Sequence, residues 1–181
     1  MRVVLQRVAH AAVEIDGAPH SKIGRGILIL LGIEPIDTQD DADWLVKKIA
    51  ALRIFDDENG VMNRNVCEID GQLLVVSQFT LMASYKKGNR PSYIRAARPE
   101  IAVPLYEYFV EQMKQTTGKA VETGVFGADM QVSLLNDGPV TITMDTHHKE
   151  GPTSRAMHTM NTLYIIQPPH NNDGTTHKIY G

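Results

Sequence analysis

The longest apolar run of the sequence is Gly26-Ile-Leu-Ile-Leu-Leu-Gly-Ile33. A helix needs about 20 apolar residues to cross a bilayer, so this run is far too short to span a membrane. Its length and its isoleucine and leucine content instead favour a β-strand that is buried on both faces. We therefore expect this run at the centre of a sheet.

Strands are also predicted on the N-terminal side of this run. Residues 2–15 are rich in β-forming side chains and end at Asp16-Gly17, a pair typical of hairpin turns. A short strand near His20–Ile23 can pair back onto them. The first residues alternate apolar and basic side chains, unlike the apolar centre of a signal peptide, so we predict a cytoplasmic protein without a membrane segment.

Two helices are predicted on the C-terminal side. Polar cap residues precede apolar residues that share one helical face, which predicts a helix over about 38–54. A second helix is expected over about 99–117, followed by Gly118 as its cap. Strands are expected at about 72–76, 120–126, 130–135 and 140–144. A turn at Asn136-Asp-Gly-Pro139 separates the last two, and the order of elements is that of one α/β domain.

The composition limits the kinds of site that the chain can form. The chain has 181 residues, 43% of them hydrophobic, which is sufficient for one packed core. Its single cysteine, Cys67, excludes an internal disulfide, and neither a cysteine pair nor a helical histidine pair has the spacing of a zinc site. We therefore predict no metal and no cofactor.

A local basic segment is the candidate for RNA contact. The net charge of −3 is not that of a protein that coats nucleic acid, so a patch would have to bind it. Between residues 81 and 99 there are five basic and no acidic side chains: Lys86, Lys87, Arg90, Arg95 and Arg98. From charge alone, a solvated surface loop is the more frequent explanation.

The segment Ser77-Gln-Phe-Thr80 follows a predicted buried strand. Its main-chain N–H groups leave the sheet there, and such donors can form an oxyanion hole, each contributing a factor of about 100 to 1,000 in rate. A strand end whose Ser and Thr cap a turn is the simpler explanation. Ser77 and Thr80 are also candidate nucleophiles, but each needs an adjacent base, and the sequence contains no recognisable Ser-His-Asp order.

Four motifs, taken together and in this order, resemble the D-aminoacyl-tRNA deacylase family. They are Met1-Arg-Val-Val-Leu-Gln-Arg-Val8, Ser77-Gln-Phe-Thr-Leu81, Lys87-Gly-Asn-Arg-Pro-Ser92 and Asn136-Asp-Gly-Pro-Val-Thr141. The resemblance covers about residues 1–145. It implies a layered α/β/β fold with β-sheets packed on two main helices, a single domain over residues 1–146, and a homodimer. The irregular C-terminal extension, 147–181, has no counterpart in it.

The resemblance also assigns site residues. In the family, the segment matching Ser77, Gln78, Phe79 and Thr80 meets a Gly-Pro segment from the other subunit. It implies that Gly138-Pro139 is cis, although only about one X-Pro bond in twenty is cis in general. Arg7 matches a residue that braces this segment, and Met130 matches a pocket residue near the terminal adenosine.

The activity implied is hydrolysis of the ester bond of D-aminoacyl-tRNA, and of glycyl-tRNA in which glycine is mischarged onto tRNA-Ala. Rigid backbone would occupy the space that an L side chain needs, so L-aminoacyl esters are rejected by a clash. Water would attack the ester with help from the terminal ribose hydroxyl of the RNA, while amides near Gln78, Phe79 and Thr80 hold the oxyanion. Thr80 as a covalent nucleophile is the older alternative.

The 3′ end of the tRNA needs its own contacts. Single-stranded RNA ends are held by phosphate contacts and by stacking on aromatic rings, and Lys86, Lys87 and Arg90 with Phe79 or Tyr85 can supply both. Two other functions stay open at this point. One is an RNA-binding homologue without turnover, and the other is a deacylase that removes L-amino acids mischarged on specific tRNAs.

Overall fold

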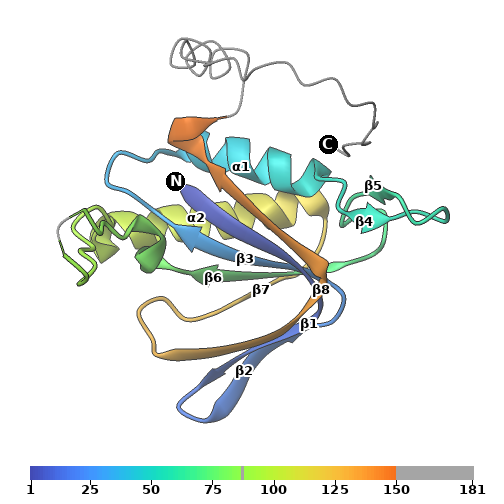
Figure 1. Cartoon of the computed structure of the whole chain (residues 1–181), viewed down its shortest axis with the longest axis horizontal. Coiled ribbons are helices and arrows are strands. Elements are labelled where there is room, and N and C mark those ends of the chain that lie inside the picture. Colours follow the sequence, from blue (N-terminus) through green and yellow to red (C-terminus); the bar gives the residue numbers. More distant parts are fainter. Residues whose placement is uncertain (87, 150–181) are drawn as a thin grey trace, which may run out of the picture. The chain divides into compact units, whose positions relative to one another are not determined.

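The computed structural model describes residues 1–86 and 88–149, and residues 1–148 form one compact unit of mixed α/β structure (Figure 1). Its elements, in chain order, are β1 (Arg2–Ile15), β2 (Ala18–Ile23), β3 (Gly26–Gly32), α1 (Gln39–Ala51), β4 (Phe55–Asp56), β5 (Met62–Arg64), β6 (Gln72–Ser77), the 3-10 turn η1 (Phe79–Met82), α2 (Pro99–Thr117), β7 (Val121–Thr123), β8 (Met130–Asp145) and the 3-10 turn η2 (Thr146–His148).

The apolar run forms β3, which lies at the centre of the main sheet as predicted. It pairs antiparallel with β1 and parallel with β6, and β7 continues the sheet beyond β6. At its first residue the two parallel strands approach so closely that a Cβ on Gly26 would lie 1.9 Å from the carbonyl oxygen of Gln72. A glycine is therefore required where β3 begins.

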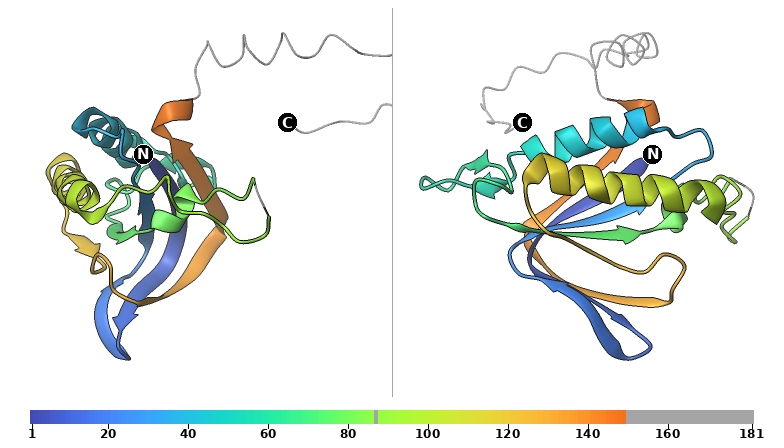
Figure 2. Two further views of the ribbon diagram at one scale, coloured as in Figure 1. Left: turned by 90° about the vertical axis from the view of Figure 1, so that its left-hand side faces the viewer. Right: turned by 180° about the vertical axis from the view of Figure 1, so that it is seen from behind.

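The strand β1 changes partners halfway along. Residues 2–8 pair with β3, residues 11–15 pair with β2, and β8 runs along the other edge of both halves. The second half of β1 bends away from the helices together with β2 and the first half of β8 (Figures 1 and 2). The sheet consequently curls back toward β6 and β7, and its concave face carries a second apolar cluster that includes Leu28, Leu74 and Val76.

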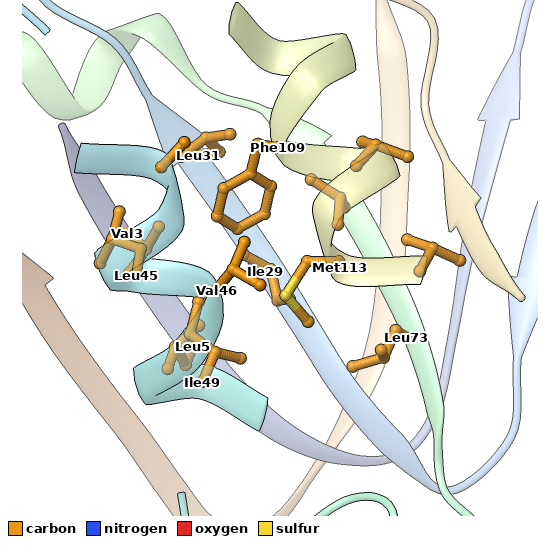
Figure 3. Close-up of a cluster of buried hydrophobic side chains, with 14 of the residues drawn as sticks. Val3, Leu5, Ile29, Leu31, Leu45, Val46, Ile49, Leu73, Phe109 and Met113 are labelled. Atoms are coloured by element: carbon orange, nitrogen blue, oxygen red, sulfur yellow. The ribbon is translucent and has the colours of Figure 1, made fainter. Parts of the chain in front are cut away.

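Both helices cover the opposite face of the sheet (Figure 2). The helix α1 begins at a capping box between Thr38 and Asp41, and α2 begins at Pro99 and ends at Gly118, whose φ is 65°. Figure 3 shows their apolar side chains, among them Leu45 and Phe109, against the side chains of β1, β3 and β6. This face forms the larger of the two buried clusters.

The predicted turn at 136–139 is wrong. Residues 130–145 form one continuous strand, β8, and Gly138-Pro139 lies within it at an irregularity where the register with β1 shifts on both sides of Val8. Proline is tolerated because, in the described unit, β8 pairs on one side only and its other edge is open. Gly138 has a φ of 121°, and its bond to Pro139 is cis, as the resemblance implies.

Other predicted boundaries need smaller corrections. The first helix ends at Ala51 rather than near residue 54, because Leu52 is extended, and β7 ends at Thr123 rather than at 126. Of the predicted extension, residues 147–149 are described and the rest lies outside the described residues. No helix within the described ranges is long and apolar enough to cross a membrane.

Candidate active site

A cleft of about 560 Å³ opens where β3 and β6 end. The lining includes residues 76–79 at the end of β6, residues 96–99 at the start of α2, and residues 126–130, which lead into β8. Leu31 and Ile33 at the end of β3 also contribute to it. Ser77, Gln78, Phe79 and Met130, all predicted site residues, lie together in this lining. The fold thus joins two predicted segments that are fifty residues apart in sequence.

The main chain turns sharply at the end of β6. The Gln78 amide donates to the Leu31 carbonyl at 2.8 Å, so this amide is committed to β3 and does not face an oxyanion. The amides of Phe79 and Thr80 open a 3-10 turn, and no hydrogen bond to an acceptor in the described chain is found for them. The predicted set of oxyanion donors is therefore reduced to these two amides.

Close packing holds this turn in place. A Cβ on Gly32 would lie 3.0 Å from the Gln78 carbonyl oxygen and 2.9 Å from the Met82 methyl group, so the turn packs directly on the backbone of β3. On the other side, the Tyr106 hydroxyl donates to the Val75 carbonyl at 2.9 Å. Burial raises the pKa of Tyr106 to about 12, so the hydroxyl keeps its proton for this bond.

Among the described residues, neither hydroxyl of the segment is hydrogen-bonded to a histidine or a carboxylate. The Thr80 hydroxyl oxygen accepts a hydrogen bond from the side-chain amide of Gln78 at 2.5 Å. Of the histidines that the structure describes, none hydrogen-bonds to Ser77 or Thr80, and His147 and His148 pair with Asp37 and Asp145 instead. A hydroxyl without a general base is a poor nucleophile, which argues against Thr80 as the attacking group.

Apolar side chains of Phe126 and Met130 form part of the wall opposite the end of β6. The Met130 sulfur lies against the backbone of Gly124, where a Cβ would come within 2.4 Å of it. Phe126 stacks edge to face on Tyr106, with ring centroids 6.1 Å apart. The absence of a side chain at Gly124 thus makes the room that Met130 occupies, and this relation was not apparent from the sequence.

Aromatic rings are exposed at the cleft. Phe79 and Tyr93 meet edge to face with centroids 5.1 Å apart, and both belong to the lining. Phe79 is 56% exposed, so its ring offers a face to a ligand. Tyr93 was not among the site residues predicted from the sequence. It lies just after the basic motif, and only the fold brings its ring to Phe79.

The basic segment forms a loop beside this aromatic pair. Ser84 and Ser92 exchange two backbone hydrogen bonds of 2.8 Å, which close the loop, and Lys86 and Arg90 are exposed on it. Lys87 lies outside the described residues. Arg95 is not an uncompensated charge as predicted, because its guanidinium lies 2.5 Å from the Glu34 carboxylate. The loop therefore offers fewer free cations than its sequence indicates.

Gly138-Pro139 lies elsewhere in the unit. Neither residue is in the described lining of the cleft. Arg7, which is buried, donates from Nε to the Asp137 carbonyl at 3.0 Å and from Nη1 to the Ile54 carbonyl at 2.7 Å. It therefore touches the segment it was predicted to brace, and a Cβ on Gly138 would come within 2.8 Å of its guanidinium.

The register gives the separation between this segment and Ser77. Arg7 pairs with Ile27, which pairs with Leu73, and Ser77 follows four residues later on β6. At about 3.3 Å per residue this is roughly 13 Å along the strand, in addition to the width of the strands that lie between them. Within one unit the two segments are well beyond contact distance.

One group of side chains near the chain's first residue has metal-ligand composition. Asp37, Asp41 and His147 offer ligand atoms that lie within 4.8 Å of one another. However, the Asp37 carboxylate accepts from the Met1 ammonium and contacts His147 Nε2 at 2.7 Å. Its charge is already compensated by a cation of the chain, so the cluster is explained as an ion-pair network.

The sequence of the chain is similar to those of known deacylases. The family model described as D-Tyr-tRNA(Tyr) deacylase matches residues 4–145. Over 150 residues, the chain is 64% identical to a D-aminoacyl-tRNA deacylase of Bacteroides thetaiotaomicron and 64% identical to one of Porphyromonas gingivalis. Both alignments cover 83% of this chain and 100% of the relative.

Solved structures agree with the sequence relatives. One, described as the c-Myc DNA Unwinding Element Binding Protein, has a TM-score of 0.76 and 44% identity over 80% of this chain and 98% of that chain. Another, from a structural analysis of a probable eukaryotic D-amino acid tRNA deacylase, has a TM-score of 0.68 at 18% identity and shares the fold. This chain therefore belongs to the D-Tyr-tRNA(Tyr) deacylase family, as its four motifs predicted.

Proposed function

We propose that this protein hydrolyses the ester bond of D-aminoacyl-tRNA and releases the free D-amino acid and tRNA. The observation that carries the proposal is the cleft at the end of β6, where two uncommitted amides at Phe79 and Thr80 lie next to a lining that contains no histidine among the described residues. Family membership and the names of the relatives support the same reaction. Residues 1–146 are the proposed catalytic domain.

The proposed mechanism uses main-chain groups. Water attacks the ester carbonyl, and the Phe79 and Thr80 amides stabilise the negative charge that develops on its oxygen. The ribose 2′-hydroxyl at the RNA terminus assists the attack in place of a side-chain base. This assignment agrees with the pairing of Thr80 to Gln78 and with the separate partners of His147 and His148. Thr80 as a nucleophile stays the alternative.

A homodimer is part of the proposal. Gly138-Pro139 and Ser77 are too far apart in one unit to form a joint site, so the Gly-Pro segment must come from a second copy if the two act together. The open edge of β8 supports association, because long unpaired strand edges in proteins are usually covered. Arg7 then positions the segment that its own unit lends to the partner.

Chiral selection would follow from this geometry. Main-chain atoms of a partner's Gly138-Pro139 would fill the side of the α-carbon where an L side chain projects. A D side chain would point out of the cleft and would not clash with them. Such a wall needs no contact with the side chain, so many D-amino acids would be accepted. Glycine has no side chain to clash, so glycyl-tRNA mischarged on tRNA-Ala would also be hydrolysed.

The loop closed by Ser84 and Ser92 is the proposed contact for the RNA. Lys86 and Arg90 are exposed there and form no ion pair with the rest of the described chain, and Lys87 is adjacent in sequence. Phe79 and Tyr85 are exposed nearby in sequence and are available for base stacking. Phosphate contacts and stacking would place the 3′ end at the cleft.

The decisive experiment compares D-tyrosyl-tRNA, L-tyrosyl-tRNA and glycyl-tRNA at equal enzyme concentration. We expect rapid hydrolysis of the D ester, hydrolysis of the glycyl ester, and no acceleration for the L ester. Binding of all three without turnover would favour a non-catalytic RNA-binding protein. Preferred hydrolysis of the L ester would favour a deacylase of mischarged L-amino acids and would contradict the proposal.

A further inference from the structure

We propose that Glu34 and Arg95 are a pair of positioning residues that hold one wall of the cleft, and that Arg95 is not an RNA contact. The proposal rests on the proposed function for its kinetic consequence. Its structural part rests on the described contacts alone. It concerns the short segment between the basic loop and α2, residues 92–97, which contributes Tyr93, Ala96 and Ala97 to the lining.

This segment has few contacts of its own. It contains no helix or strand, and Ala96 donates to the Tyr93 carbonyl in a single turn at 2.9 Å. Ser92 is bonded to Ser84, and the Tyr93 ring meets Phe79. Beyond these, the segment is held by the two residues that follow the glycine ending β3: Ala97 donates to the Ile33 carbonyl at 2.9 Å, and the Arg95 guanidinium lies 2.5 Å from the Glu34 carboxylate. Two successive residues after β3 therefore hold the wall on either side of Ala96.

The burial of Glu34 makes this ion pair different from an ordinary surface pair. The Glu34 side chain is 10% exposed, and its Oε1 atom is fully enclosed without an aligned hydrogen bond in the described chain, so its close contact with Arg95 is ionic. A carboxylate that loses its paired cation in such a place remains charged in a medium of low dielectric, which is energetically unfavourable. Removing Arg95 should thus expel Glu34 and move the wall.

The backbone of Glu34 is itself fixed. Its amide donates to the Asp37 carboxylate at 2.7 Å, and Asp37 is buried between the Met1 ammonium and His147. The carboxylate that receives Arg95 is therefore mounted on a rigid part of the unit. The Arg95 side chain, which is 48% exposed, reaches this fixed carboxylate from the segment that forms the wall.

The chain offers a matched control. Arg64 pairs with Glu58 at the same distance of 2.5 Å, and Arg64 is 45% exposed against 48% for Arg95. The carboxylates differ, because Glu58 is 72% exposed. Arg64 lies on β5, outside the lining of the cleft. The variant Arg64→Met therefore removes a comparable ion pair without touching the wall.

The test uses the full chain with Arg95→Met, Glu34→Gln, Arg95→Lys and Arg64→Met. We expect kcat/KM on D-tyrosyl-tRNA to fall about tenfold or more for both Arg95→Met and Glu34→Gln, because small displacements in a site are costly. Arg95→Lys should recover most of the activity, and Arg64→Met should match the wild type. Hydrogen exchange should accelerate at the Ala97 amide in the first two variants only.

A salt titration separates this role from RNA contact. A side chain that neutralises one phosphate contributes about 0.7 to 0.9 to the slope of log affinity against log salt. Arg95→Met should leave that slope for tRNA unchanged, whereas Arg90→Met should lower it. A lowered slope for Arg95→Met, with a wild-type rate for Glu34→Gln, would overturn the proposal and make Arg95 an RNA contact.

Failure of the proposed function has a different signature. If the wild type leaves D-aminoacyl-tRNA intact, the reaction is refuted, and exchange at Ala97 still decides whether the pair holds the wall. If Arg95→Met does not fold by circular dichroism, Glu34→Gln and Arg95→Lys carry the same comparison. Unchanged exchange at Ala97 in Glu34→Gln would refute the positioning role itself.

Discussion

The two faces of the central sheet are made by the same strands but are covered in different ways. On one face, α1 and α2 close a continuous apolar core in which Leu45 and Phe109 are fully buried (Figure 3). On the other, the curled parts of β1, β2 and β8 enclose a smaller cluster, which is open at the end where the cleft lies. Successive side chains of β3 and β6 point alternately to the two faces.

Stability and function therefore depend on different faces of the sheet. A helix pair can be packed without gaps, so the helical face supplies most of the buried apolar area and fixes β3 and β6. The strand face leaves space that a substrate can enter, and its residues, such as Met130 and Val132, are partly buried. Substitutions should therefore act on stability on one face and on activity on the other.

The largest effect is expected where both faces depend on the same backbone. In Gly26→Ala the new Cβ would overlap the Gln72 carbonyl, so β3 and β6 could not pair at their start. We expect a loss of at least about 4 kcal/mol in the free energy of unfolding, or no folded protein. Urea denaturation measures it. Gly24→Ala is the control, since its Cβ would meet only the flexible Gln72 side chain at 3.3 Å, and an equal loss there would contradict the explanation.

A matched pair of substitutions compares the faces directly. Leu45→Ala removes a fully buried side chain from the helical face and should cost about 3 kcal/mol. Leu134→Ala, on the partly buried strand face, should cost roughly 1 kcal/mol. Thermal and chemical denaturation of both variants gives the two values. Equal costs would show that the strand face is as well packed as the helical one, and the comparison would fail.

Gly32→Ala tests the junction between the faces. Its Cβ would crowd the Gln78 carbonyl and the Met82 methyl group, so the turn that carries the Phe79 and Thr80 amides must move outward. We expect a destabilisation of about 1–3 kcal/mol and a loss of deacylation of roughly a hundredfold. Rates at saturating enzyme and the melting temperature should be recorded together. Full activity in a folded variant would exclude these amides as oxyanion donors.

The smallest effect is expected at the end of β8. Burial would raise the pKa of Asp145, but hydrogen bonds from Arg2, the His147 amide and His148 outweigh it and hold the pKa at about 2. Because this pKa is lower in the folded than in the unfolded state, the stabilisation is complete above about pH 4 and disappears as the pH falls to about 2.

Asp145→Asn should therefore lower the free energy of unfolding by about 1–2 kcal/mol at pH 7, a value reduced for partial exposure, and the difference from wild type should vanish toward pH 2. Asp70→Asn removes a carboxylate that is 99% exposed and should change stability much less. Denaturation midpoints measured from pH 7 to pH 2 give both curves. A difference that grows on acidification would have the wrong sign.

Much of the fold was predictable because its signals are local. The β3 run, the helix from Pro99 to Thr117 and the first hairpin are encoded by periodicity, caps and turn residues that lie within each segment. The turn predicted at Gly138-Pro139 failed for a physical reason. Glycine and proline mark a break in pairing, and such a break can be an irregularity inside a long edge strand as well as a turn.

The four motifs were sufficient to identify the family, and they also singled out Ser77, Gln78, Phe79 and Met130, which the fold brings together in the lining of the cleft. Three features could be seen only in the folded chain: the Gln78 amide is bound to β3, Arg95 is paired with Glu34, and Gly138-Pro139 lies far from the cleft of its own unit. The reason is that each of these depends on which distant groups meet across the sheet. Pairing between distant residues is set by packing and register, which no local pattern records.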